Sequence, residues 1–169
     1  MGAGSLSAFI GSSQSEAQGV IENFLKTYTG VARFIKWSEE FVEANGFVKT
    51  PLGRKRHLPE AKYQGREKRM IALKMAAYRK AVNSQIQGFA SDIIAVAMRN
   101  IRREFMKRDW WLRKAMLQLQ VHDELHLEVD ADIAEEAFKL MQHLMEHAIE
   151  LRVPVLAEGS VGDNWRDAK

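Results

Sequence analysis

The sequence predicts an α+β fold, in which helices come first and a small antiparallel sheet with packed helices follows. Apolar residues recur at helical spacing through most of the first 110 positions. Over residues 117–129 apolar and polar residues alternate instead, which is typical of half-buried strands. Because the strands follow the helices rather than alternating with them, α+β is favoured over a parallel α/β sheet.

Composition limits the classes of protein that this chain can belong to. Its 169 residues can form one domain with its own core, or two small ones. The absence of cysteine excludes disulfides, thiolate metal sites and cysteine nucleophiles. No apolar run reaches the roughly 18 residues that cross a bilayer, and no signal-peptide pattern is present, so we expect no membrane partner.

The net charge of +3 conceals a strong asymmetry along the chain. Residues 49–80 carry eleven Lys and Arg against two acids, and residues 99–114 carry seven against two. From His122 to the end, twelve acids face four bases. A basic middle and an acidic end suit a polyanionic partner on one surface and cations at an acidic cluster. Solvated helix faces would give similar runs of charge.

Two helices are expected near the N-terminus. Residues 1–14 are rich in Gly and Ser and should be irregular or a short helix. Ser15 is the expected N-cap of a helix over residues 16–26. Thr29-Gly30 should interrupt it before a second helix over residues 31–44.

A basic hairpin and a long helix come next. Asn45-Gly46 should end the second helix, and residues 47–50 and 55–58 should pair around Pro51-Leu52-Gly53. A helix over residues 66–107 follows, with or without a break near Lys80. Its core-facing stripe is expected at Val82, Ile86, Phe89, Ile93, Val96 and Ile101.

Three polar residues of the long helix, Arg79, Asn83 and Gln87, lie four positions apart. On a helix this spacing aligns them in one row, about 100° from the apolar stripe. Their side chains can hydrogen-bond base edges and sugars, and Gly88 would let a ligand approach the backbone. An ordinary amphipathic boundary would show the same row.

Residues 120–124, Gln-Val-His-Asp-Glu, place two adjacent carboxylates at the tip of a second predicted hairpin. The turn contains no Gly, Asn or Pro, so His122 or Asp123 should adopt a positive φ under strain. Adjacent carboxylates repel each other unless a cation lies beside them, which makes Asp123 and Glu124 a candidate metal site. A solvated turn with incidental acids is the alternative. Beyond this hairpin, residues 130–132 should cap a helix that ends near Leu151, and residues 153–158 should form a final strand.

The Val-His-Asp-Glu sequence between two apolar strands resembles motif C of the family A DNA polymerases. That family includes bacterial DNA polymerase I and the eukaryotic theta and nu enzymes. Residues 79–94 resemble the helix that precedes motif C, although Ser91 stands where alanine is usual. Three further stretches, residues 28–31, 46–59 and 153–165, match in order. The resemblance covers essentially the whole chain.

This resemblance implies nucleotidyl transfer by two Mg²⁺ ions, with a DNA primer-template and a dNTP as substrates. Asp123 would be the catalytic, metal-bridging ligand, and Glu124 would support the metal site or its waters. His122 would contact the primer terminus, and Gln120 would bind the primer-template beside it.

The same resemblance assigns the remaining DNA-binding residues and the subdomains. The polar row Arg79, Asn83 and Gln87 would track the minor groove, and the basic hairpin would bind the primer-template through Arg54, Lys55 and Arg56. Residues 1–72 would be the remainder of the fingers, including the hairpin over residues 46–59. Residues 73–169 would be part of the palm.

A family A polymerase also needs the Asp of motif A and the fingers helix, motif B, that grips the nucleotide. Neither is found in this sequence, and residues 1–4 align directly after the Tyr-Gly that ends that helix. We therefore expect a chain that is inactive alone and needs a larger N-terminal polymerase chain to supply both motifs. It would be the small half of a split polymerase, of a kind that a phage genome can encode, or a cut product of a longer one. Met1 favours a natural gene start, and the expected location is the cytoplasm of a bacterial or phage-infected cell.

Two alternatives remain open. A non-catalytic DNA-binding accessory subunit would keep the basic hairpin and the minor-groove helix but not the metal site. His143, Glu146 and His147 fit the His-x2-Glu-His pattern of inverted zinc peptidases, in which the histidines share zinc and Glu is the base. That pattern needs a third ligand from a downstream helix, and little chain remains after Leu151.

Overall fold

The computed structural model describes residues 2–168 and divides into two compact units, residues 1–85 and 86–169. The predicted α+β class is confirmed, because helices dominate and two small antiparallel sheets are present. The division falls between Gln85 and Ile86, whereas the fingers and palm were assigned with a boundary after residue 72, which stays a prediction. No described helix is both long and apolar enough to cross a membrane.

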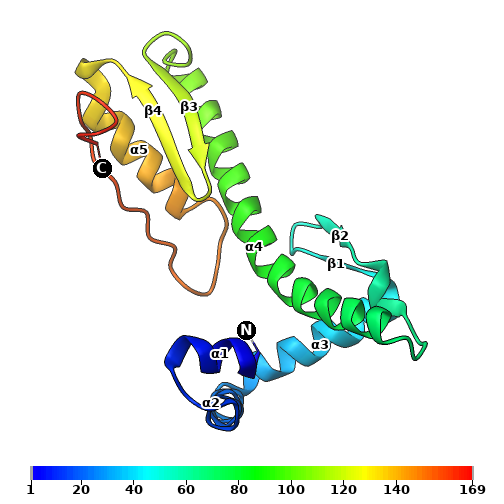
Figure 1. Ribbon diagram of the computed structural model, residues 1–169. Helices are drawn as coiled ribbons and strands as arrows, with labels where there is room; N and C mark the ends of the chain where they lie inside the picture. The colour runs from blue at the N-terminus through cyan, green and yellow to red at the C-terminus, as the bar shows by residue number, and fades with distance from the viewer. Residues whose placement is uncertain (1, 169) are drawn as a thin grey trace. The chain divides into compact units, whose positions relative to one another are not determined.

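Unit 1 is mainly helical, and Figure 1 shows its elements in blue to green. In chain order these elements are α1 (Ala3–Ile10), α2 (Gln14–Thr27), α3 (Thr29–Asn45), β1 (Phe47–Lys49), β2 (Lys55–His57), the 3-10 turn η1 (Pro59–Lys62) and the first half of α4 (Lys68–Lys107). Unit 2 contains the second half of α4, β3 (Ala115–Val121), β4 (Glu124–Val129), the 3-10 turn η2 (Ala131–Ile133) and α5 (Ala134–Glu146).

The first helices begin and end differently from the sequence prediction. Ser13, not Ser15, is the N-cap of α2, because its side chain and that of Glu16 form a reciprocal capping box. Thr29-Gly30 does not separate the next two helices: α2 ends at Thr27, Tyr28 joins them, and α3 begins at Thr29. The short helix that was one option for residues 1–14 is α1.

The core of unit 1 lies where α3, the first half of α4 and the basic hairpin meet. Its buried apolar residues are Val42, Val48, Leu58, Ala61, Ala77 and Ala81. Beside it, the buried Gln85 side chain donates a 2.9 Å hydrogen bond to the Ser38 hydroxyl, so that two buried polar groups satisfy each other.

A polar network also joins α3 to α4. The Glu43 carboxylate accepts hydrogen bonds from Lys74 Nζ and the Tyr78 hydroxyl, each at 2.6 Å, and from Gln64 at 3.0 Å. These hydrogen bonds lower the pKa of Glu43 to about 2, and the bond from Lys74 has the largest effect. Glu43 is therefore ionised at neutral pH and ties the two helices together.

The predicted basic hairpin is confirmed. β1 and β2 pair antiparallel, with Val48 opposite Arg56. The turn between them contains Gly53 at φ 92°, a backbone conformation that side-chain-bearing residues rarely adopt. The Thr50 amide donates to the Arg54 carbonyl at 2.9 Å, which closes the turn.

Helix α4 runs through Lys80 without a break, and its predicted core stripe is partly wrong. Ile101 is buried as expected, but Ile86 is 59% exposed. Each half of the helix has its own buried positions, three or four residues apart: Ala77, Ala81 and Gln85 in unit 1, and Ile94, Ala97, Ile101 and Phe105 in unit 2. The predicted stripe over residues 82–101 is partly wrong because it assumed that the whole helix packs against a single core.

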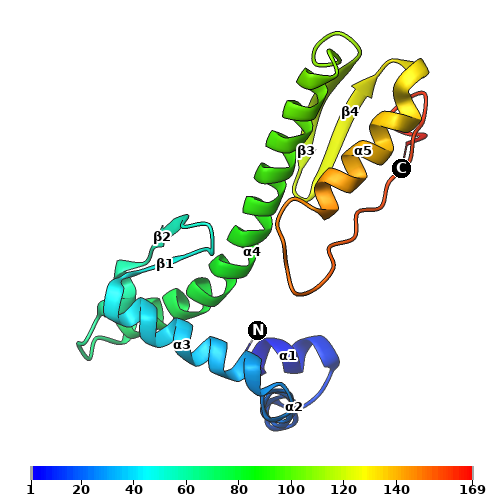
Figure 2. The same ribbon diagram turned by 180° about the vertical axis from the view of Figure 1, so that it is seen from behind.

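In unit 2 the β3–β4 hairpin runs alongside the second half of α4, and α5 lies beside it (Figures 1 and 2). One core contains Ile94, Ile101, Phe105, Ala115, Leu125, Ile133 and Ala137. Helix α5 ends at Glu146, before the predicted end near Leu151. The predicted strand over residues 153–158 is wrong, because side chains of α5 bind its backbone instead: Gln142 donates to the Ala157 carbonyl, and Glu146 accepts from the Ala157 amide at 3.1 Å.

Candidate functional site

The β3–β4 hairpin turns through two residues, His122 and Asp123, because Val121 pairs with Glu124. His122 has φ 54°, which confirms that a non-glycine residue adopts the positive φ of this turn. A positive φ at the first central residue alone is the pattern of a type II′ turn, where glycine is usual. The sequence thus places a strained residue directly before the two carboxylates.

The apolar alternation that predicted this hairpin holds in only part of it. Leu125 is buried, and Leu117, Leu127 and Val129 pack against the core, but Leu119 is 40% exposed. The pairing shifts between Leu117 and Leu119, which indicates an extra residue in β3. Such a bulge moves the side chains that follow it to the other face of the strand. The bulge therefore affects the last residues of β3, just before the turn.

Both carboxylates at the tip of the β3–β4 hairpin are exposed. No hydrogen bond or ion pair to Asp123 occurs within residues 2–168, and the Glu124 side chain is 68% exposed. Gln120 Nε2 donates to the His122 carbonyl at 3.1 Å, which places Gln120 against the backbone of the turn. Gln120, His122, Asp123 and Glu124 are therefore together in unit 2, as predicted.

Asp123 and Glu124 have the chemistry that Mg²⁺ prefers, since carboxylate oxygens are its usual protein ligands. They fit part of a magnesium site only. Nowhere in residues 2–168 do three His, Cys, Asp or Glu side chains lie close enough together to hold a metal ion. Further ligands would have to come from outside this stretch of chain.

His126 is a neighbour of the turn that the sequence interpretation did not include. Its Nε2 lies 3.5 Å from Glu124 Oε2, is shielded from solvent and has no hydrogen-bond partner in the described residues. The Trp165 ring covers it at a centroid distance of 4.9 Å. The period-two pattern of β4, which puts His126 on the same face as Glu124, was the signal available in the sequence.

The polar row of α4 is accessible. Arg79, Asn83 and Gln87 lie on successive turns of one continuous helix, and all three are exposed. A helix advances about 6 Å over four residues, so the row can follow a groove rather than a single point. The structure thus keeps these residues available for a ligand.

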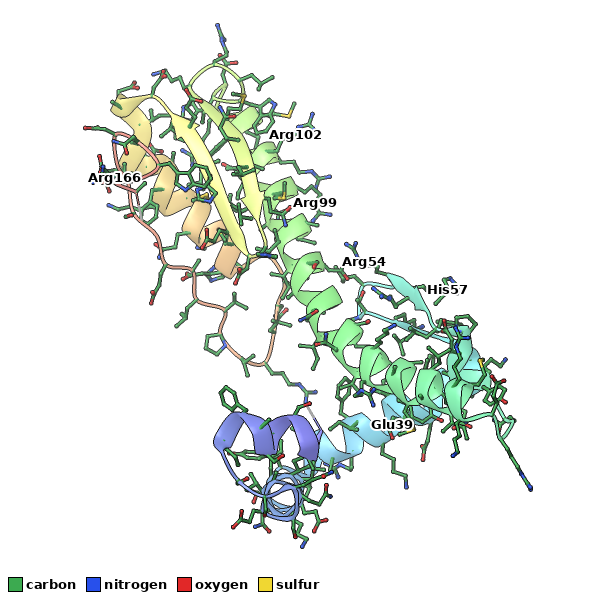
Figure 3. The ribbon with its side chains drawn as sticks, viewed as in Figure 1. Glu39, Arg54, His57, Arg99, Arg102 and Arg166 are labelled. Atoms are coloured by element: carbon green, nitrogen blue, oxygen red, sulfur yellow. The ribbon has the colours of Figure 1, made fainter. Side chains whose placement is uncertain are left out.

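The basic residues of the first hairpin are exposed too. Arg54 lies at the end of its turn, and Lys55 and Arg56 lie on β2; Figure 3 labels Arg54 and His57 on this hairpin. Lys55 Nζ lies 4.9 Å from the centre of the Phe47 ring, a cation–π contact.

The zinc alternative gains no support from the geometry. The ring centroids of His143 and His147 are 4.2 Å apart, and His147 Nδ1 lies 2.9 Å from the His143 carbonyl oxygen. Glu146, the expected base, instead accepts the Ala157 amide. No third ligand joins them within residues 2–168.

Known proteins resemble this chain along its whole length. The family model for DNA polymerase family A matches residues 1–167. DNA polymerase I of Pseudomonas aeruginosa is 36% identical over an alignment that covers 99% of this chain and 18% of that protein. The thermostable DNA polymerase I of Thermus filiformis is 36% identical, with 100% of this chain and 19% of that protein covered. The chain therefore spans about a fifth of the length of these relatives.

A solved structure is similar as well. The POL domain of Pol1 from M. smegmatis, in complex with DNA primer-template and dNTP, matches 99% of this chain with a TM-score of 0.88 and 33% identity. The match covers 28% of that chain.

Proposed function

This chain belongs to DNA polymerase family A, and from that membership we propose that it is the part of a template-directed DNA polymerase that binds the primer-template and contributes Asp123 and Glu124 to catalysis. The observation that carries the proposal is the β3–β4 turn. Its two adjacent carboxylates are exposed and directly follow His122, whose φ is 54°. Asp123 has no partner within residues 2–168.

The two carboxylates would hold magnesium, with Asp123 as the shared ligand and Glu124 as the supporting one. Magnesium bound there would make the primer 3′-hydroxyl a better nucleophile and offset the charge on the phosphate under attack. The exposure of both side chains supports this role, because a metal and a DNA end can approach them from solvent.

Other residues of the chain would position the DNA. Arg79, Asn83 and Gln87 would hydrogen-bond the minor groove, where acceptor atoms recur at every base pair. His122 and Gln120 would contact the primer terminus beside the carboxylates. Arg54, Lys55 and Arg56 would neutralise backbone phosphates, which positions DNA without reading its sequence.

Catalysis requires residues that this stretch does not contain. Two metals need carboxylates from more than one strand, and the described residues hold no cluster of three metal-ligating groups. We therefore propose that a larger polymerase segment supplies the motif A aspartate and the nucleotide-binding helix, and that the chain alone does not extend primers. The split-polymerase interpretation, the phage source and the cytoplasmic location stay predictions.

Primer extension by the chain mixed with such a larger segment tests this function. The chain without that segment should not extend primers, and the mixture should do so with Mg²⁺ present. Asp123→Ala should reduce extension by the mixture about 100-fold or more, because several kcal/mol of charge stabilisation are lost.

Asp130→Ala is the matched control, since Asp130 is an exposed aspartate beyond the other end of β4. It should extend primers at the wild-type rate. A mixture in which Asp123→Ala matches the wild type would contradict the catalytic role and favour the accessory subunit.

A further inference from the structure

Unit 1 carries a row of ring side chains that the proposed metal chemistry does not use. The row, called the aromatic row here, consists of Phe34, Trp37, Phe41, Phe47 and His57. Successive ring centroids lie 6.2, 5.3, 5.9 and 6.0 Å apart. The row runs from α3 across β1 to β2, so it joins a helix face to the basic hairpin.

Among the three rings of the aromatic row that lie on α3, that of Trp37 is the most exposed to solvent. It is 50% exposed, whereas Phe34 and Phe41 are partly buried on either side of it. These neighbours lie three residues before and four residues after Trp37, which is the spacing of contacts along one helix face. They hold the indole in place, and half of it stays exposed within residues 2–168, so it is an ordered platform.

Positive charge lies next to the rings because of the strand register. Val48 is 1% exposed and faces the core, so its neighbours Phe47 and Lys49 project from the opposite face of the hairpin. Phe47 pairs with His57 and Lys49 with Lys55, which puts two rings and two lysines on that face. Neither lysine forms an ion pair within residues 2–168.

The carboxylates of α3 do little to offset this charge. Glu40, one turn beyond Trp37, pairs with Lys36 at 3.8 Å. Glu43 is held by Lys74, Tyr78 and Gln64. Glu39, labelled in Figure 3, is partly buried, and burial raises the pKa of its carboxyl.

We propose that the aromatic row binds single-stranded DNA, with bases stacked on Trp37 and its neighbours and phosphates near Lys49 and Lys55. Exposed rings on which bases can stack, beside lysines without an ion pair, are the combination by which proteins hold single strands without reading sequence. Base faces inside a duplex are already stacked on one another, and an acidic peptide would need the lysines but not the rings. The proposal extends the proposed function, in which the unpaired strand would be the template ahead of the primer.

Binding of a fluorescein-labelled oligo-dT of about 12 nucleotides, followed by fluorescence anisotropy with the whole chain, tests this site. Trp37→Ala should weaken binding about 5- to 150-fold, the range for loss of one stacked base. Trp37→Phe, which keeps a ring, should retain most of the affinity. Lys55→Ala should weaken binding and make it less sensitive to salt.

Tyr28→Ala is the matched control, because Tyr28 is another exposed aromatic of unit 1, at 55%, outside the row. It should bind oligo-dT as the wild type does. A duplex of the same length should bind Trp37→Ala and wild type alike. Far-UV circular dichroism checks the fold, and Trp37→Leu replaces Trp37→Ala if the latter unfolds.

Unchanged oligo-dT affinity of the folded Trp37 variant would overturn the proposal. Equal loss of oligo-dT and duplex binding would do so too, as would displacement of oligo-dT by polyglutamate as readily as by unlabelled oligo-dT. The assay uses no nucleotide and no complementing segment. A failure of the catalytic role of Asp123 would therefore leave its outcome unchanged.

Discussion

The two hairpins of this chain differ in charge and in how they turn. The basic β1–β2 turn puts its unusual backbone conformation on a glycine, Gly53 at φ 92°, and closes with backbone hydrogen bonds. The acidic β3–β4 turn puts φ 54° on His122, where glycine would cost less strain. Because glycine would fit the turn at less cost, we propose that the His122 side chain has a use beside the two exposed carboxylates.

Gly53→Ala should have the largest effect on stability in this comparison. No atom of residues 2–168 lies within 4 Å of the added methyl group, so the cost is the backbone conformation alone, about 1–3 kcal/mol. Urea unfolding of the whole chain measures it. Gly19→Ala, an open helical position of α2, should stabilise by about 0.5–1 kcal/mol. Equal effects at both sites would show that the turn of the basic hairpin is not constrained.

Acid should weaken unit 1 through Glu43. Because its pKa falls from 4.5 to about 2 on folding, its contribution is complete above pH 4.5 and is lost as the pH drops toward 2. We expect a loss on the order of 1 kcal/mol, since more than a third of the side chain is exposed and solvent screens it.

Glu43→Gln should abolish that part of the pH dependence of urea unfolding between pH 4.5 and 2. At neutral pH this variant should already be less stable than the wild type, because Lys74 loses its carboxylate partner. A variant with the same acid profile as the wild type would assign the acid sensitivity to other carboxylates.

His122→Gly should have the smallest effect on stability and a separate effect on function. Relief of the positive φ and the greater entropy of unfolded glycine nearly cancel, so the free energy of unfolding should rise by less than about 1 kcal/mol. Primer extension with the larger segment should fall, because the side chain that contacts the primer terminus is gone. Undiminished extension would show that His122 serves only the turn.

The sequence predicted the hairpins and the long helix well, because turn chemistry and periodicity are local properties. Pro51 and Gly53 mark the basic turn, and the alternation after Glu124 marks β4. A positive φ at residue 122 or 123 followed from the lack of any glycine in the turn.

Features that depend on tertiary packing were missed. The bulge between Leu117 and Leu119 exposes residues that alternation alone would bury. Residues 153–158 have a strand-like sequence, but side chains of α5 bind the Ala157 backbone. The aromatic row joins residues of three elements, and no local pattern places Phe41 beside Phe47.

Anomalous scattering from manganese would test the central claim most directly, in crystals of the chain with its complementing segment and a primer-template. We expect manganese within about 2.1 Å of an Asp123 carboxylate oxygen, as hard cations bind oxygen ligands. Manganese bound elsewhere, with the Asp123 side chain turned toward bulk solvent, would contradict the account.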